Sequence, residues 1–165
     1  MADDNGVIAD IEADLVSKLA AITVNSEAIF RTADHWHFQL TGGDSFTKYA
    51  PFAFVEYQGT SRAGWEGDHD LNYRMIFTVR VGTEINQAKQ GAARIGIGTD
   101  AGIGTRQLGL SRLQQEVIEA VQEQLPTTTD GDVERYEYEG DELVWSTPHQ
   151  AALMMRFSIE RVIST

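Results

Sequence analysis

The chain has 165 residues, of which 42 % are hydrophobic and 23 % are charged, so we expect one soluble domain with a hydrophobic core. It contains no cysteine, which excludes disulfides, thiolate nucleophiles and zinc sites built from cysteine, and no apolar run reaches the roughly 18 residues that a membrane span requires. Its 25 acidic and 13 basic residues give a net charge of −12, which disfavours tight nucleic-acid binding because such binding depends on cations that displace counterions from phosphates.

The N-terminal segment has the pattern of an amphipathic helix. Apolar residues recur at spacings of three and four from Ile8 to Ile22, and Asp4 or Asn5 can cap the first turn. This pattern predicts a helix over residues 5–21. Acidic residues stand where a secretory signal would carry a basic stretch, so no such signal is expected.

Two strands separated by a glycine-containing turn are predicted next. The first covers residues 27–40, with Ile29 and Phe30 as its apolar centre. Glycine and polar residues at 42–45 mark the turn. The second strand covers residues 51–57, and its apolar content predicts burial on both faces. It begins with a proline, which the first position of a strand tolerates.

The clearest strand of the chain follows a polar loop that we expect from Gly59 to Asp70. Six apolar residues alternate with mostly polar ones from Leu71 to Val81, which is typical of a long strand with one buried face. A glycine-dense segment follows at about residues 85–106. It holds almost no large side chain, so ordering it would cost backbone entropy and bury little. We therefore predict a flexible loop there with a functional role.

The C-terminal part of the chain is predicted to contain one more helix and three more strands. The helix covers residues 107–125, where apolar residues again follow the helical period. A hairpin follows, with strands at 133–138 and 142–146 around a turn at 139–141, and a final alternating strand covers residues 153–163.

This order of elements predicts an α+β fold. We expect one mostly antiparallel or mixed β-sheet with the two helices packed on one face. No internal repeat and no domain boundary is apparent, so residues 1–165 are predicted to form a single domain.

His35 and His37 lie two residues apart, so on a strand their imidazoles share one face and could bind one metal ion. A third ligand would have to come from Asp34 or from residues 68–70. Histidines at this spacing are also common on ordinary strands, as solvated or packed side chains. We expect no metal, and we keep a small metal-dependent enzyme that uses His35, His37 and His69 as an alternative.

No motif for a cofactor or a catalytic group has its required context. The segment Gly96–Ala101 superficially matches the dinucleotide fingerprint, but that motif needs a strand directly before it, and the nearest predicted strand ends near Val81. The sequence contains no P-loop, HExxH or GxSxG motif, and no Ser–His–Asp grouping has a recognisable frame. The sequence therefore predicts no cofactor and no enzymatic activity.

Trp65 and Arg62 stand out in the loop predicted at residues 59–70. A large aromatic side chain outside any periodic pattern is either a lid over the core or an exposed anchor for a partner. The sequence leaves both interpretations open, and Trp145 poses the same question.

The predicted elements follow a definite order. An acidic amphipathic helix comes first, followed by the proline-led strand Pro51–Val55, the long strand Asn72–Val79, the helix that includes Leu108–Leu113 and a final alternating strand. This order resembles small phage tail proteins. The nearest likeness is to the Mu-like prophage tail family and to the wider group of tail terminator and completion proteins that includes the lambda terminator. The resemblance covers most of the chain and rests on pattern and length.

The resemblance implies a structural subunit of the virion tail, assembled in the host cytoplasm. It implies a homo-oligomeric ring, expected to be a hexamer, that caps the tail tube and joins it to the head. Its partners would be the tail-tube protein and the head–tail connector proteins, and it brings no catalytic residues. The net charge of −12 agrees with a ring through which DNA passes without specific binding, although acidic surfaces also simply confer solubility.

Two loops are the predicted docking surfaces of such a ring, residues 62–70 and residues 91–104. Arginine and tryptophan are enriched where binding energy concentrates in interfaces, and a flexible loop can become ordered on contact. The predicted interface residues are Arg62, Trp65, Arg94, Gly96, Gly98, Gly102, Gly104 and Arg106. A third possibility is a monomeric adaptor domain, which would remain a single subunit at every concentration.

Overall fold

The computed structural model describes residues 4–42, 44–66, 70–85, 108–128 and 133–164. Apart from Ile85, the glycine-dense segment predicted at about residues 85–106 lies outside these ranges.

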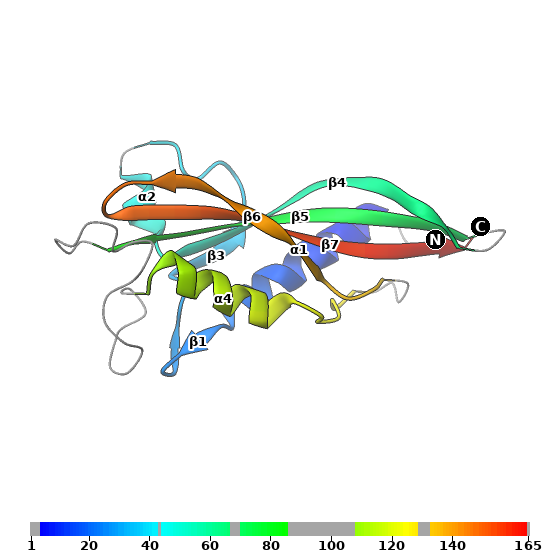
Figure 1. Ribbon diagram of the computed structural model, residues 1–165, viewed down its shortest axis with the longest axis horizontal. Helices are drawn as coiled ribbons and strands as arrows, with labels where there is room; N and C mark the ends of the chain where they lie inside the picture. Colours follow the sequence, from blue (N-terminus) through cyan, green and yellow to red (C-terminus); the bar gives the residue numbers. More distant parts are fainter. Residues whose placement is uncertain (1–3, 43, 67–69, 86–107, 129–132, 165) are drawn as a thin grey trace.

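The described chain folds into helices and a mixed five-stranded sheet (Figure 1). The elements are α1 (Asp4–Ala20), β1 (Thr23–Val24), β2 (Glu27–Ala28), β3 (Thr32–His35), α2 (Ser45–Tyr49), β4 (Phe52–Glu66), β5 (Asp70–Glu84), α4 (Leu110–Val121), β6 (Glu137–Ser146) and β7 (Gln150–Ser164). The strand order is β3-β4-β5-β7-β6, with β3 parallel to β4 and every other pair antiparallel, while β1 and β2 form a separate two-stranded sheet. The expected α+β class is confirmed.

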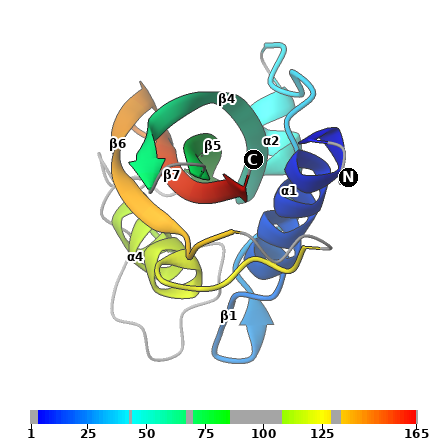
Figure 2. The same cartoon turned by 90° about the vertical axis from the view of Figure 1, so that its right-hand side faces the viewer.

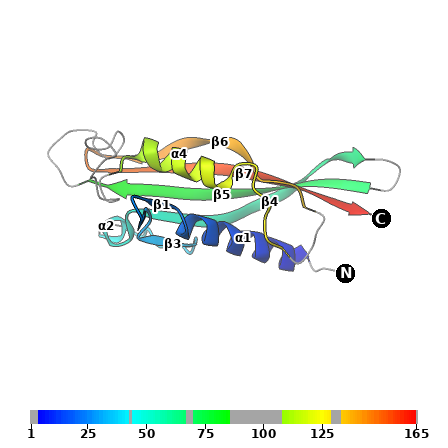
Figure 3. The same cartoon turned by 90° about the horizontal axis from the view of Figure 1, so that it is seen from below.

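The main hydrophobic core lies between one face of the large sheet and helices α1 and α4, which cross that face side by side (Figures 2 and 3). The buried residues of the helices and the three longest strands in this core are Val7, Ile11, Leu15, Leu19, Leu110, Leu113, Val117, Val121, Ala53, Val55, Met75, Phe77, Val79, Val81, Ala151, Leu153, Met155, Phe157 and Ile159. The buried residues recur every three or four positions in the helices and at every second position in the strands, as the apolar pattern of the sequence predicts. The two predicted helices therefore share one face, as expected.

The second helix is shorter than predicted. It ends at Val121, and Leu125, which was expected in its apolar stripe, is 56 % exposed. The backbone leaves the helix at Glu123, which has a left-handed φ of 61° and donates its N–H to the carbonyl of Tyr136 at 2.9 Å. Pairing with the segment before β6 thus ends the helix before Pro126 could.

A second, smaller core covers the opposite face of the sheet. It contains Phe46 and Ala50 from α2 and its end, Phe52 and Phe54 from β4, and Ala152 from β7. Burial of β4 on both faces at residues 52–55 is confirmed, because its alternate residues enter the two cores. Helix α2 was not predicted, since residues 42–45 indicated only a turn. A helix of five residues is not stable by propensity, and its packing on the phenylalanines of β4 holds it.

The prediction of a loop from Gly59 to Asp70 was wrong. Strand β4 continues to Glu66, and β5 begins at Asp70. The described side chains of β4 beyond Val55 are exposed or half-buried and polar, apart from Tyr57, so no apolar alternation marks the strand. Antiparallel pairing with β5 sets its conformation, and register shifts near Gly59 absorb the irregular stretches.

The prediction of a hairpin turn at residues 139–141 was also wrong. Strand β6 runs without a break from Glu137 to Ser146, and Gly140 sits at a bulge with a φ of 118°. The turn between β6 and β7 lies around Pro148 instead, where the N–H of Thr147 bonds to the carbonyl of Gln150 at 2.7 Å. The strand predicted at 133–138 reduces to an isolated bridge at Val133 followed by the start of β6.

The strand predicted at residues 27–40 divides into short pieces. Residues 27–28 pair with β1, and only residues 32–35 join the large sheet, as β3. Ile29 and Phe30 are buried as expected, but they lie between the two strands.

A buried hydrogen bond ties the segment before β6 to helix α1. The hydroxyl of Tyr136, which is 1 % exposed, donates to the carboxylate of Asp14 at 2.7 Å, and Lys18 donates to the same carboxylate at 2.9 Å. Burial by itself would raise the pKa of Asp14, but the bonds from Lys18, Tyr136 and the backbone of Thr127 outweigh it, so its pKa is lowered from 3.8. Burial and the neighbouring carboxylate raise the pKa of Tyr136.

We expect Tyr136→Phe to lower the free energy of unfolding by about 1–2 kcal/mol at pH 7, because the buried carboxylate of Asp14 loses a donor. A carboxyl group whose pKa is lower in the folded than in the unfolded state stabilises the folded protein at pH values above the unfolded-state pKa. That stabilisation is lost as the pH falls through the folded-state pKa. The cost of the substitution should therefore shrink as the pH falls below about 4. Urea unfolding at pH 7 and pH 3 measures both values.

Tyr57→Phe is the matched control, because within the described ranges the hydroxyl of Tyr57 bonds to exposed Thr60 alone. It should change stability by less than about 0.5 kcal/mol at either pH. A cost for Tyr136→Phe that stayed constant across this pH range would contradict the role given to Asp14.

Candidate protein interface

Large apolar side chains are exposed at two places beside the smaller core. Phe38, just after β3, is 71 % exposed. Leu143, Val144 and Trp145, in the second half of β6, are between 47 % and 51 % exposed. Strands β3 and β6 are the two outer strands of the five-stranded sheet, so both of its edges carry exposed apolar groups.

Phe38 is held in place by the neighbouring aromatic residue. Trp36 packs against Phe54 of β4, with ring centroids 5.8 Å apart, and the guanidinium of Arg80 lies 4.5 Å from the Trp36 centroid. Phe38 leans on the outer side of Trp36 at 5.6 Å. Its φ of 60° is in the left-handed region, which a bulky side chain adopts at a cost in energy. Strain and exposure together favour an intermolecular contact for this ring.

A groove of about 530 Å³ runs between these two apolar places. One wall is formed by Trp36, Leu40 and the start of α2, and the other by the end of β6. It is lined by Trp36, Leu40, Gly42, Ser45, Phe46, Phe52, Arg80, Val144, Trp145, Gln150 and Ala152. The charge of Arg80 is balanced by Glu56 at 2.6 Å, so the lining is mostly apolar, with one paired cation and the neutral polar groups of Ser45 and Gln150. Such a surface suits a protein contact better than a reaction that needs a reactive group.

The outer edge of β6 has no neighbouring strand among the described residues. The indole N–H of Trp145 bonds to the side chain of Gln150 at 3.2 Å, which holds the ring over β7 while about half of it stays exposed. Long edge strands with exposed apolar side chains are unusual in monomers because they promote pairing between chains. Strand β6 is therefore a candidate contact surface.

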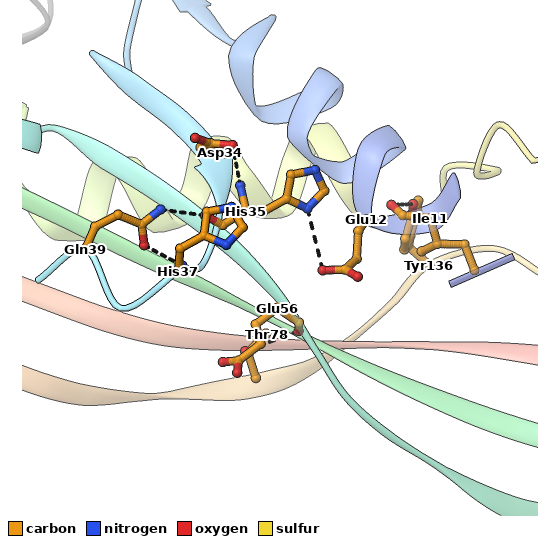
Figure 4. A network of polar contacts seen from close by, with 9 residues as sticks. All are labelled: Ile11, Glu12, Asp34, His35, His37, Gln39, Glu56, Thr78 and Tyr136. Carbon is orange, nitrogen blue, oxygen red and sulfur yellow. Dashed lines mark hydrogen bonds and ion pairs between the residues drawn. The ribbon is translucent and has the colours of Figure 1, made fainter. Parts of the chain in front are cut away.

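At the opposite edge of the sheet, side chains occupy the outward backbone groups of His35, the last residue of β3 (Figure 4). The N–H of Trp36 bonds to β4, so by alternation the polar groups of His35 point away from the sheet. The N–H of His35 donates to Asp34 at 2.7 Å, and its carbonyl accepts from the amide of Gln39 at 2.6 Å. A further strand could not add there without breaking these bonds.

His35 and His37 come close to each other, but the third ligand of the predicted metal site is not placed. Their ring centroids are 6.2 Å apart. In Figure 4 the ring of His35 turns toward Glu12 of α1, with Nδ1 3.6 Å from the carboxylate. His69 lies outside the described residues, and among those that are described no group of three or more His, Cys, Asp or Glu side chains could hold a metal ion.

Most of the predicted interface residues fall where nothing is described. These are Arg94, Gly96, Gly98, Gly102, Gly104 and Arg106. Arg62 is exposed on β4, opposite Tyr73, and Trp65 belongs to the same strand. The apolar groove lies at the other end of the sheet, where Ala152 pairs with Gly82. Tyr73 and Gly82 are 82 − 73 = 9 positions apart on β5, which places Arg62 about 30 Å from the groove. Arg62 and Trp65 therefore do not join the groove.

The one sequence signal for this site was Trp145, whose exposure the sequence left open. Trp36 and Phe38 were not predicted to belong to it, because only the spacing of His35 and His37 was considered in that stretch. The groove itself could not be predicted, because its walls are about a hundred residues apart in the chain.

Comparison with known proteins gives no family assignment. No protein-family model matches the chain, and the search of curated proteins returned no match. Within the described ranges, no helix is long and apolar enough to cross a membrane.

Proposed function

We propose that this chain is a structural, non-enzymatic subunit of a phage-like tail, a tail terminator or completion protein. Copies of the chain form a ring of six that caps the tail tube and joins it to the head. Its partners are the tail-tube protein and the head–tail connector proteins. The order of elements that resembles this family supports the proposal, and the α+β fold agrees with it.

The observation that carries the proposal is the pair of exposed apolar surfaces at the two edges of one sheet. Phe38 marks the β3 edge, and Trp145 with its neighbours marks the β6 edge. The two surfaces differ in sequence and shape, so a contact that joins one to the other is heterologous. Heterologous contacts form a closed ring when the rotation between subunits closes on itself.

The charge of the chain supports a role around DNA without binding to it. With a net charge of −12, the subunit repels the phosphate backbone, and a ring of several copies multiplies this effect. DNA passes through such a ring without specific contacts. The proposal includes a location in the virion tail, after assembly in the host cytoplasm.

The proposal is tested by adding the purified full-length chain to tubes of the tail-tube protein encoded in the same genome. We expect a six-membered ring by mass photometry, and tubes that stop growing with extra density at one end by electron microscopy. Closure of the growing end explains both effects. Tubes that keep growing and show bare ends would contradict the function, and a single subunit at every concentration would favour the monomeric adaptor.

A further inference from the structure

A polar cavity of about 490 Å³ lies beside the start of β6. It is separate from the apolar groove, because the two have no lining residue in common. Three strands and the residues just after α4 contribute to its lining, which consists of Asn72, Gln122, Glu123, Glu134, Arg135, Tyr136, Glu137, Ser158, Glu160 and Val162. A cavity of this size suits a small molecule or one long side chain.

The walls of this polar cavity are held by hydrogen bonds to the main chain. The N–H of Glu134 donates to the carbonyl of Glu160 at 2.8 Å, and the N–H of Glu123 donates to the carbonyl of Tyr136 at 2.9 Å. The guanidinium of Arg135 donates to the carbonyl of Glu123 at 2.8 Å. The fold thus forms the cavity in advance, so a ligand pays little for ordering it.

Asn72 of β5 supplies a buried acceptor that has no partner. Met75 and Phe157 point into the main core, so by alternation Asn72, Ser158 and Glu160 lie on the opposite face of the sheet, as part of the cavity lining. Asn72 is only 7 % exposed, and within the described chain its Oδ1 accepts no hydrogen bond. A buried acceptor without a partner costs free energy, which a ligand that donates to it recovers.

Two carboxylates that line the cavity lie close together. The hydrogen bond from the N–H of Glu134 to the carbonyl of Glu160 makes these residues neighbours on adjacent stretches of chain. Like charges that face each other across neighbouring strands are unfavourable. Arg74 offsets part of this repulsion, because its guanidinium lies 3.0 Å from Glu160. It also acts electrostatically on Glu137, so its single charge is divided between the acids.

The cations around the cavity do not balance its acids. Four carboxylates and one guanidinium line it, and the guanidinium of Arg74 approaches from β5, so the formal charge is −4 + 2 = −2. Farther along the same face, Glu139 and Arg156 cancel each other. Arg161 belongs to the other face, as Ile159 does. The cavity therefore favours a positively charged ligand.

We propose that this polar cavity binds an organic ammonium group. Such a group has three N–H donors, which are satisfied together by Oδ1 of Asn72 and the carboxylates of Glu134 and Glu160. Val162 offers an apolar wall to the methylene chain that carries the ammonium group. The ligand is a free amine or the side chain of a lysine, which share this chemistry.

The acceptors suit an ammonium group better than a metal ion. Calcium takes about six to eight oxygen ligands. Among the residues that the structure describes, no group of three or more His, Cys, Asp or Glu side chains could hold a metal ion. An ammonium group needs only as many acceptors as it has N–H donors, and the cavity provides them.

Saturation-transfer NMR with two amines and the full-length chain tests this proposal. The probes are cadaverine, a free diamine, and N-acetyl-lysine amide, which presents a lysine side chain as a protein does. We expect binding with a Kd of about 1 mM in low salt, and the tighter of the two probes indicates the source of the group. Pentane-1,5-diol has the length of cadaverine without its charge and should bind about tenfold more weakly or less.

Asn72→Leu keeps the size of the side chain and removes the acceptor. It should weaken amine binding about tenfold, yet it should not lower the free energy of unfolding, because Oδ1 has no hydrogen bond to lose. Thr78→Val is the matched control, since Thr78 is buried on the same face of β5 outside the cavity. It should leave the affinity unchanged, and urea unfolding compares the stability of both variants.

Glu134→Gln tests the charge of the cavity at an exposed side chain, so folding is not at risk. It should weaken binding by about threefold to tenfold, because one carboxylate no longer attracts the ammonium group. Glu27→Gln is the matched control. Glu27 is exposed on β2 outside the cavity, and its substitution makes the same change in net charge. This variant should bind as the wild type does.

Four results would overturn the ammonium site. Neither amine binds, the diol binds as tightly as cadaverine, or Asn72→Leu and Glu134→Gln bind as tightly as their controls. The fourth is displacement of the amine by calcium chloride where sodium chloride of equal ionic strength has no effect, since the cavity would then hold a metal ion. None of these results bears on the tail function, because the tube assay does not depend on this cavity.

Discussion

Phe157→Ala is expected to lower the free energy of unfolding by about 3–5 kcal/mol, since the substitution opens a cavity in the main core. Phe157 is fully buried at 0 % exposure, on a strand paired with β5 on one side and β6 on the other. Its ring packs 5.5 Å from that of Tyr138 and lies opposite Phe77. A loss of this size is a large part of the 5–15 kcal/mol typical of a domain, and urea unfolding measures it.

Phe38→Ala is the control, because the chemical change is the same at a ring that is 71 % exposed. It should change stability by less than about 0.5 kcal/mol, or raise it slightly by relieving strain at the left-handed backbone. If both substitutions cost the same, Phe38 would be part of the fold, and its assignment to an interface would fail.

The parts of the fold that the sequence predicted are those with one buried face. Strands β5 and β7 and helices α1 and α4 each place apolar residues on the main core at a regular period, so their patterns were visible. The far half of β4 has no such pattern because its described side chains from Gln58 to Arg62 do not enter either core. Its conformation comes from pairing with β5, a long-range interaction that no local pattern reports.

Glycine and polar residues misled the prediction of β6. The run Glu139-Gly140-Asp141 has the composition of a turn, yet its glycine serves a bulge inside a continuous edge strand. An exposed edge strand and a tight turn require similar residues, so composition alone does not separate them.

The candidate interface was predicted less well than the fold, for a physical reason. Exposure of an aromatic residue depends on what other segments cover, and that is a property of the tertiary structure. Trp36 and Phe38 are two residues apart in the chain, but Trp36 packs under Arg80 while Phe38 is exposed. No periodic pattern in the sequence indicates which of the two rings is exposed.

Gly82→Ala is expected to destabilise the protein by about 2–3 kcal/mol, although it adds a single methyl group. Gly82 lies opposite Phe52 in the β4–β5 register, and a Cβ there would lie 2.6 Å from Cε1 of Phe52 and still nearer its Cζ. The ring of Phe52 cannot yield easily, because it is fully buried, stacked on Phe54 at 4.9 Å and in edge-to-face contact with Phe46 at 5.1 Å.

Two further variants separate this clash from a general effect of the substitution. Gly6→Ala places its methyl group in open space on α1, so it should stabilise by about 0.5–1 kcal/mol through helix propensity. Phe52→Leu should cost less in the Gly82→Ala background than alone, since the smaller side chain relieves the contact. Urea unfolding of the wild type, Gly82→Ala, Phe52→Leu and the double variant measures these costs. If the two costs are strictly additive, a contact with Phe52 is not the reason why residue 82 excludes a side chain. In that case the smaller core would be looser than the contacts among its three phenylalanines indicate.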